Sequence, residues 1–410
     1  SQTLATLPHE IATEEGVFSS LTGEIKITGE TTVSSGSTVE VGKTKTLTVT
    51  DRFAVPLGET NNRDNAPEAG TTRFNQDFGT LEFFDGVNWK TVNSYARPGG
   101  GGRMVMAGGI TSPSNTYLSN IDYLSIPTLG NSASFGDLSA TRRRVGGVSS
   151  ETRGVFIRGT NSSNTRTNIM EYITIASGGD AINFGDAGVT GSTIGDGDGS
   201  CCSSSTRGIQ GGCGTPGNTN VITYIQINTT GNALDFGDLT QARHQIASFS
   251  SSIRAIHYSG YISPGNFGTA VDIHLISSTG NAVDFGEPLV PRYTANACAN
   301  SIRGIIPGGN GQGAPSASGY NHKSITMMNM STQGAETNFG NISVNRGGMA
   351  TSSSQTRGVF AGGYNPADVN TIDYVTIPTA GDALDFGDLT TARGGIFNGM
   401  SDSHGGLGGF

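Results

Sequence analysis

Charged side chains at repeated positions are the first candidates for chemistry in this sequence of 410 residues. An Asp, Glu or Asn stands two residues after a recurring Phe, and in most copies an arginine follows five residues later. A carboxylate beside a guanidinium suggests a catalytic pair, but an enzyme does not need the same pair in repeat after repeat. We expect these pairs to satisfy buried turn backbone and to cross between neighbouring repeats. The arginines are Arg142, Arg243, Arg292, Arg346 and Arg393, with Gly191 in the place of the arginine in the second copy.

Metal-ligating residue types occur, but their spacing is not that of a metal site. The four cysteines are Cys201, Cys202, Cys213 and Cys298, which lack the paired spacing of zinc ligands and the pattern of a disulfide framework. We expect free thiols, which suit assembly in a reducing cytosol. Asp196 and Asp198 offer oxygen ligands for calcium, but the rest of a calcium loop is missing, so a flexible insertion is the alternative that we favour.

An enzyme is the function class that the sequence supports least. The histidines at 9, 244, 257, 274, 322 and 404 show no metal spacing, and His257 and His274 are expected to be ordinary strand and loop residues. The Ser-x-Asp-x-Gly-x-Thr-Trp boxes of sialidases do not occur. We therefore expect no catalytic residues, no metal and no cofactor.

Composition and charge narrow the possible partners. The net charge is −9 with no basic stripe, so we expect no nucleic-acid partner. No stretch approaches 18 apolar residues, so we expect no membrane insertion. The high glycine content, 63 of 410 residues, together with many Ser and Thr and short apolar runs, predicts an all-β protein with many tight turns.

A repeat of roughly 50 residues organises the region 103–410. Each copy ends in Phe-Gly-Asp or a close variant, and a second arginine opens a strand of the type RGVFAGG further on. We expect four short strands in each unit, such as GGIFNGM, RGVFAGG, TIDYVTI and DALDFGD in the last. The repeated phenylalanines are Phe135, Phe184, Phe236, Phe285, Phe339 and Phe386, and the second arginines are Arg153, Arg207, Arg254, Arg303 and Arg357.

The repeat region starts and stops partway through a unit, and the strand missing at one end is present at the other. The region begins at Arg103 with a second strand that lacks its first, and it ends with a first strand that lacks its second. Pairing of 394–402 beside 103–109 would close a ring and remove two free sheet edges.

This arrangement resembles kelch propellers in its Gly-Gly doublet, in the Tyr of its third strand and in the arginine before each first strand. The resemblance implies a six-bladed kelch-like β-propeller. The kelch Trp is absent, and we expect the Phe of Phe-Gly-Asp to take its place between blades.

The first hundred residues predict a β-rich fibre or oligomerisation region. We divide it into an attachment segment (1–21), a β-rich shaft (22–50), a small β-module (51–93) and a Gly-rich linker (94–102). The shaft has too few apolar residues to build a core alone, so it is expected to wind with identical chains. In the module, hairpin strands are expected at 71–75 and 80–85, with Trp89 beginning another strand.

The run from Pro67 to Trp89 resembles a module common in tail-fibre and appendage proteins of tailed bacteriophages, particularly marine ones. The residues that carry the resemblance are a Pro-x-x-Gly-x-x-Arg-Phe-Asn start and the later Leu-Glu-Phe-Phe-Asp-Gly-x-x-Trp. It implies a virion fibre, commonly a homotrimer, with host recognition C-terminal to the module. The N-terminus would contact other virion structural proteins, and the protein would be assembled in the host cytoplasm and lie on the virion surface.

Aromatic residues in the variable loops are the candidate receptor-binding residues. The connections between second and third strands vary most among the repeats, and a rigid scaffold with variable loops on one face suits binding. The candidates are Tyr258, Tyr261, Phe267, Tyr320 and Tyr364, which suit a host-surface glycan or protein. Two other functions stay open: an extracellular carbohydrate-binding kelch-like protein of a bacterium, and a virion decoration protein without a receptor role.

Overall fold

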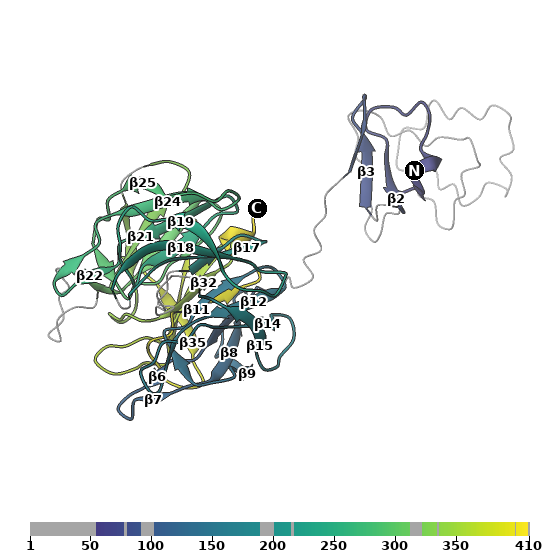
Figure 1. The fold of residues 1–410 in the computed structure, drawn as a ribbon. Coiled ribbons are helices and arrows are strands. Elements are labelled where there is room, and N and C mark those ends of the chain that lie inside the picture. Colours follow the sequence, from purple (N-terminus) through teal and green to yellow (C-terminus); the bar gives the residue numbers. More distant parts are fainter. Residues whose placement is uncertain are drawn as a thin grey trace, which may run out of the picture. The chain divides into compact units, whose positions relative to one another are not determined.

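The protein is all-β in the computed structural model (Figure 1). The structure describes residues 55–77, 80–91, 102–188, 201–214, 217–311, 322–333, 336–397 and 399–408. The predicted attachment segment, shaft and most of the linker lie outside these residues. The chain divides into two compact units, Ser1–Tyr95 and Ala96–Phe410. No helix in the described part is long and apolar enough to cross a membrane.

The first unit contains a four-stranded sheet in the order β1-β2-β3-β4. Its first pair is parallel, and the other two pairs are antiparallel. The predicted hairpin is confirmed as β2 and β3, and Trp89 begins β4 as expected. The elements are β1 (Leu57–Gly58), the 3-10 helix η2 (Thr60–Asn62), β2 (Thr72–Asn75), β3 (Thr80–Phe84) and β4 (Trp89–Thr91).

Six four-stranded antiparallel sheets make up the described part of the second unit, each meandering from a first to a fourth strand. Sheet 1 consists of β36 (Met400–Ser401), β5 (Arg103–Ala107), β8 (Asn120–Ser125) and β9 (Ala133–Asp137). Sheet 2 consists of β11 (Gly146–Ser149), β12 (Arg153–Ile157), β14 (Ile169–Thr174) and β15 (Ile182–Asp186). Sheet 3 consists of β16 (Cys201–Ser203), β17 (Arg207–Cys213), β18 (Thr219–Gln226) and β19 (Leu234–Asp238).

The remaining sheets follow the same order, so the expectation of four strands per repeat is confirmed. Sheet 4 consists of β20 (Ala247–Ser250), β21 (Arg254–Tyr258), β24 (Val271–Leu275) and β25 (Val283–Gly286). Sheet 5 consists of β27 (Cys298–Ala299), β28 (Arg303–Pro307), β30 (Ser324–Asn329) and β31 (Thr337–Asn341). Sheet 6 consists of β32 (Ala350–Ser353), β33 (Arg357–Ala361), β34 (Thr371–Thr376) and β35 (Leu384–Asp388).

Short two-stranded ribbons occupy some of the connections between these strands. They pair β6 (Ile110–Thr111) with β7 (Thr116–Tyr117), β10 (Arg142–Arg143) with β13 (Thr160–Asn161), β22 (Tyr261–Ser263) with β23 (Asn266–Phe267), and β26 (Arg292–Tyr293) with β29 (Asn310–Gly311). A 3-10 helix, η3 (Gly405–Leu407), follows β36.

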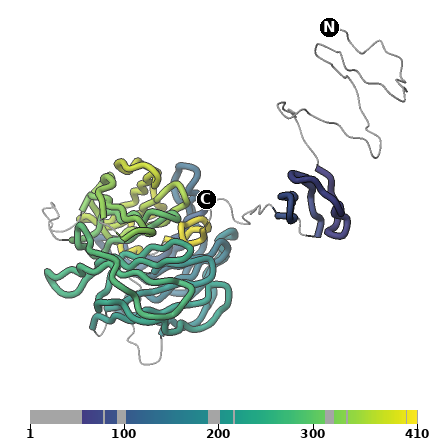
Figure 2. Tube along the Cα trace, turned by 90° about the horizontal axis from the view of Figure 1, so that it is seen from above, coloured from purple at the N-terminus to yellow at the C-terminus, as the bar shows by residue number. Residues whose placement is uncertain are grey.

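Residues near the C-terminal end complete sheet 1. Met400 lies opposite Val105 and Ser401 opposite Met104, so β36 pairs with β5 as the phase of the repeat predicted. Figure 2 follows the tube from its blue start in this unit to its yellow end. The strand is shorter than the predicted 394–402, since only Met400 and Ser401 are paired. Each first strand also lies against the first strands of two other sheets, in the cyclic order 1-2-3-4-5-6-1.

Arginine side chains link each sheet to the next at the start of the second strand. Arg103 illustrates the pattern: its guanidinium lies over the Tyr123 ring of its own sheet and donates a hydrogen bond to the Ile175 carbonyl of sheet 2. The last copy, Arg357, donates to the Ile126 carbonyl of sheet 1 and so joins the end of the series to its beginning. The donor–acceptor pairs are Arg103–Ile175, Arg153–Ile227, Arg207–Ile276, Arg254–Met330, Arg303–Ile377 and Arg357–Ile126, at 2.8–3.2 Å.

The repeated phenylalanines are buried between neighbouring sheets. Phe135 packs with Phe156 and Ile173 of sheet 2 and meets Tyr123 of its own sheet edge to face, with ring centroids 6.0 Å apart. The same Tyr–Phe contact recurs in sheets 2, 3 and 6. The interpretation of this Phe as the wedge between repeats is therefore confirmed.

The repeat arginines are buried, but their expected partners were wrong. Arg393 pairs with Asp122 at 2.7 Å, and Asp122 lies on the third strand of the sheet that the arginine enters. The equivalent pairs are Arg142–Glu171, Arg243–Asp272 and Arg346–Asp373. The acidic residue of Phe-Gly-Asp is not this partner; at Asp388 the backbone N–H donates a hydrogen bond to the Asn131 side chain in the next sheet. The pairs also satisfy turn backbone, as expected: Arg393 donates to the Gly108 carbonyl.

Two sheets depart from this pairing in a consistent way. Sheet 3 has Thr223 where the acid stands elsewhere, and the arginine is also missing, since Gly191 replaces it. In sheet 5, Thr326 replaces the acid while Arg292 is kept, and Glu336 comes within 3.5 Å of that arginine. An unpaired buried charge is thus avoided in both sheets, as its desolvation cost requires.

Candidate receptor-binding face

The connections between second and third strands lie on one face of the second unit, which we call the loop face. In an antiparallel meander the fourth-to-first connections share this face. Gly102, where the described part of the unit begins, and η3 lie at the opposite ends of the strands, because Gly102 precedes the second strand of sheet 1 and η3 follows its first. The loop face is therefore remote from the point at which the chain enters the unit.

Three of the five predicted binding residues lie on the loop face. Tyr261 and Phe267 pair across the β22–β23 ribbon and are half-buried. Both contact Tyr293, with ring centroids 5.0 and 5.6 Å away. His244 packs on the other side of Tyr261 at 5.0 Å. We call Tyr261, Phe267, Tyr293 and His244 the aromatic cluster.

The aromatic cluster is held by polar contacts beneath it. His244 and Tyr261 exchange two backbone hydrogen bonds. The Asn218 side chain donates to the Ile262 carbonyl at 2.7 Å and contacts Nδ1 of His244 at 2.8 Å. Sequence reasoning did not predict that Tyr293 joins this cluster. Its position directly after a repeat arginine, on the same face as the variable loops, was the available signal.

Tyr258 was wrongly assigned to the binding surface. Its side chain is fully buried at the end of β21. The hydroxyl lies 2.7 Å from the Val290 carbonyl and 2.9 Å from Oε2 of Glu336, and burial raises the pKa of the phenol. Its repeat equivalents Ile157 and Ala361 are buried too. Tyr320 lies outside the described residues.

Tyr364, the third surface candidate, is 49% exposed and lines a pocket on the loop face. We call this the axial pocket; it has a volume of about 480 Å³ and collects residues from sheets 1, 5 and 6 and from the connections leading into sheets 1, 2, 5 and 6. The residues that matter below are Ser112, Arg143, Arg144, Asn310, Tyr364 and Asp368.

The floor of the axial pocket is built from backbone at one repeated position. The residue two places after each repeat arginine has a left-handed backbone, with φ between 50° and 68°. The residues are Arg144, Gln245, Thr294, Gly348 and Gly395, and all of them except Gln245 line the pocket. Arg144 donates its N–H to the Gly395 carbonyl, and Gly348 donates to that of Thr294, both at 2.9 Å. These cross-sheet bonds fix the floor without using side chains.

At the other end of the strands, the segment after β36 fills the space between the first strands. Serine hydroxyls join neighbouring first strands there: Ser250 donates to the Ser203 carbonyl at 2.7 Å, and Ser203 to that of Ser149 at 3.0 Å. His404 reaches the same Ser149 carbonyl with Nε2, and burial lowers its pKa to about 4. Any side chain at Gly406 would collide with backbone of Ser203. The remaining cavity is only about 50 Å³.

No group of three or more metal-ligating side chains occurs among the residues that the structure describes. The four cysteines are free, and burial raises the pKa of Cys201 and of Cys298 to about 12. Such thiols are unreactive as nucleophiles. Asp196 and Asp198 lie outside the described residues.

A pair of histidines occupies the core of sheet 4. Nε2 of His257 lies 3.1 Å from Nε2 of His274, and Nδ1 of His257 lies 2.8 Å from the Ser248 hydroxyl. Both side chains are buried, and burial lowers the pKa of each below 6.5. His257 is fully enclosed, whereas His274 is 8% exposed and lines a pocket of about 570 Å³ beside the outer strands of sheet 4.

The histidine pair should make the protein sensitive to acid. Because each pKa is lower in the folded than in the unfolded chain, the unfolded chain takes up protons first. The stabilisation is complete above about pH 6.5 and is lost as the pH falls below it. The double variant His257→Phe/His274→Ile copies Phe156 and Ile173 of sheet 2. Urea unfolding at pH 8 and pH 5 should show a smaller pH dependence in the variant, and an unchanged dependence would refute this role.

Comparison with known proteins adds no assignment: no protein-family model and no curated protein matches this chain.

Proposed function

We propose that this chain is a homotrimeric appendage of a tailed-phage virion, such as a tail fibre, whose second unit is a six-bladed kelch-like β-propeller that binds a host-surface receptor. The six sheets, their cyclic contacts and the pairing of β36 with β5 support the propeller. The arginine links from Arg103 to Arg357, which return to sheet 1, support closure of the ring.

The structure of the loop face is the main support for a receptor-binding role. It bears the aromatic cluster and the axial pocket, and it lies at the end of the strands away from Gly102. Anchored aromatic side chains on a rigid scaffold are typical of binding surfaces. Multiple copies in a virion would multiply weak single contacts into firm adhesion.

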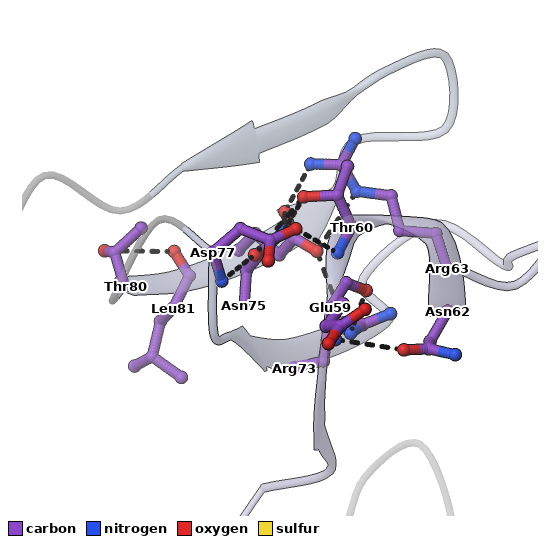
Figure 3. A network of polar contacts seen from close by, with 10 residues as sticks. Glu59, Thr60, Asn62, Arg63, Arg73, Asn75, Asp77, Thr80 and Leu81 are labelled. Carbon is purple, nitrogen blue, oxygen red and sulfur yellow. Dashed lines mark hydrogen bonds and ion pairs between the residues drawn. The ribbon is translucent and has the colours of Figure 1, made fainter.

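The first unit supports the resemblance to phage fibre modules, because the motif residues share one physical role. Glu82 is buried and receives a salt bridge from Arg63 at 2.5 Å, a second from Arg73 at 3.5 Å and a hydrogen bond from Asn75 at 3.1 Å. Figure 3 shows Arg63, Arg73 and Asn75 gathered in this network. The Arg63 hydrogen bond holds the pKa of Glu82 below its usual value. The motif thus encodes the polar interior of a small sheet.

The other side of that sheet supports oligomerisation. Phe74 lies opposite Leu81, and Leu57 lies beside Phe74, so their side chains share one face with Phe83. All four are more than a third exposed, and Leu57 is 68% exposed. A small sheet that buries its charges and exposes its apolar side chains is suited to packing against copies of itself. The segment 1–21 would attach the trimer to other virion proteins.

Host adsorption tests the receptor role. Changing Tyr261, Phe267 and Tyr293 together to Ala should lower adsorption to host cells at least about tenfold, since each anchor contributes roughly 1–2 kcal/mol and the copies act together. The same chain should behave as a trimer in light scattering before and after the change. The control is Leu384→Ala, which removes an exposed side chain on an outer strand of sheet 6. Normal adsorption of the triple variant, together with normal adsorption after removal of the second unit, would instead favour a decoration protein.

A further inference from the structure

The axial pocket contains hydrogen-bond acceptors with few partners. Oδ1 of Asn310 is buried and has no hydrogen-bond partner among the described residues, and the buried carboxylate of Asp368 interacts only with the hydroxyl and the backbone N–H of Ser112. Buried acceptors in this state are rare, because each loses its bonds to water without replacement. Burial raises the pKa of Asp368, and the nearby Ser112 offsets this only in part. The pocket therefore calls for a ligand that supplies hydrogen-bond donors.

The charges around the pocket restrict the ligand. Arg143 and Arg144 line the same pocket, with the Arg143 guanidinium over the Tyr117 ring, and their positive charges disfavour a cation as the source of those donors. The Asp368 carboxylate disfavours an anion. A neutral molecule that carries several hydroxyl groups escapes both penalties, because a hydroxyl donates to carboxylate and amide oxygens and accepts from guanidinium groups.

The shape and the remaining lining fit such a ligand. Tyr364 offers a half-exposed ring, and aromatic rings pack on the apolar faces of sugars. The volume of about 480 Å³ falls within the range of small-molecule sites. The backbone floor formed by Arg144, Thr294, Gly348 and Gly395 is already fixed by hydrogen bonds, so little ordering is needed on binding.

We infer that the axial pocket binds a neutral sugar ring, with Asp368 and Asn310 accepting hydrogen bonds from its hydroxyl groups and Tyr364 packing against one face. This inference names the receptor chemistry of the proposed function and rests on it for its biological meaning. The binding itself can be measured on the isolated chain.

Saturation-transfer NMR and titration of the full-length protein test the inference. The probes are the methyl glycosides of glucose, mannose and galactose, with glucuronate and glucosamine as the charged comparators. At least one neutral glycoside should bind in the millimolar range, and neither charged sugar should bind more tightly. Asp368→Asn and Tyr364→Ala should each weaken binding at least about tenfold, while the melting temperature stays unchanged. Leu289→Ala, on the same face but outside both the pocket and the aromatic cluster, is the matched control and should leave binding unaltered.

The outcomes separate the pocket from the function. No binding of any neutral glycoside, tighter binding of a charged sugar, or full binding by Asp368→Asn and Tyr364→Ala would overturn the inference. Sugar binding that requires Asp368 would support the pocket. If adsorption to host cells were nevertheless independent of the second unit, only the proposed function would be overturned.

Discussion

Deleting residues 399–410 is expected to abolish the cooperative unfolding transition of the second unit. The deletion removes β36, which leaves β5 without one of its two partners, and it removes the buried Met400 side chain from the core that also holds Val105 and Phe156. It also empties the space that His404 and Gly406 fill between the first strands. Loss of a large buried side chain alone costs about 2–5 kcal/mol, and the open edge and lost hydrogen bonds add to this. The total approaches the whole stability of an ordinary domain.

Calorimetry and circular dichroism measure this effect. The matched control is the chain 96–410, which lacks the first unit but keeps β36, and it should melt as the second unit of the full chain does. A single substitution provides a milder version: Gly406→Val places a side chain against the Ser203 backbone and should lower the melting temperature without removing any residue. A deletion variant that melts at the parent temperature would show that the contacts of β36 do not stabilise the unit.

Replacing Arg393 by Ala is expected to destabilise the second unit by about 3–5 kcal/mol. Arg393 and Asp122 are both buried and lie 2.7 Å apart, so the substitution leaves a carboxylate in the core without its partner. The substitution also removes the hydrogen bond to the Gly108 carbonyl. Thr390 still donates to Asp122, but one neutral hydroxyl does not replace a guanidinium.

The double variant Arg393→Met/Asp122→Leu separates the charge from the packing. It removes both ions, and it should recover much of the lost stability, because buried ion pairs exchanged for apolar residues are often neutral. Sheet 3 provides the natural precedent, since it lacks both members of the pair. Denaturant unfolding of the single variants Arg393→Met and Asp122→Leu and of the double variant gives the coupling energy directly. Single variants that cost no more than the double variant would contradict the role of desolvation.

Regular features of this fold were predictable because they recur. The spacing of Phe135 and its copies predicts the strands, and the phase of the ends predicts which strand β36 joins. The partner of each repeat arginine was not predictable from local spacing, because Arg142 and Glu171 are 29 residues apart and the acid of Phe-Gly-Asp was nearer in sequence. The signal lay in comparing the copies, since sheet 3 loses arginine and acid together.

The candidate site was harder to predict, because it depends on burial and on contacts between distant residues. Tyr258 was taken as a loop aromatic, yet its repeat position is buried in other sheets as well. The axial pocket joins Ser112, Asn310 and Asp368, which come from the connections between second and third strands of three different sheets. These residues lie together because of the cyclic order of the sheets, which no local pattern in the sequence indicates.

The pairing of β5 on both sides has a mechanical consequence for an appendage. A particle held through the loop face and tethered through the chain at Gly102 would put tension along the strands of sheet 1. Since β5 lies between β36 and β8, the load would fall on two rows of hydrogen bonds in shear, which must break together rather than one after another. The row between β36 and β5 is the weaker of the two, because β36 pairs through only two residues where the first strands of sheets 2, 4 and 6 pair through four, so it is expected to fail first.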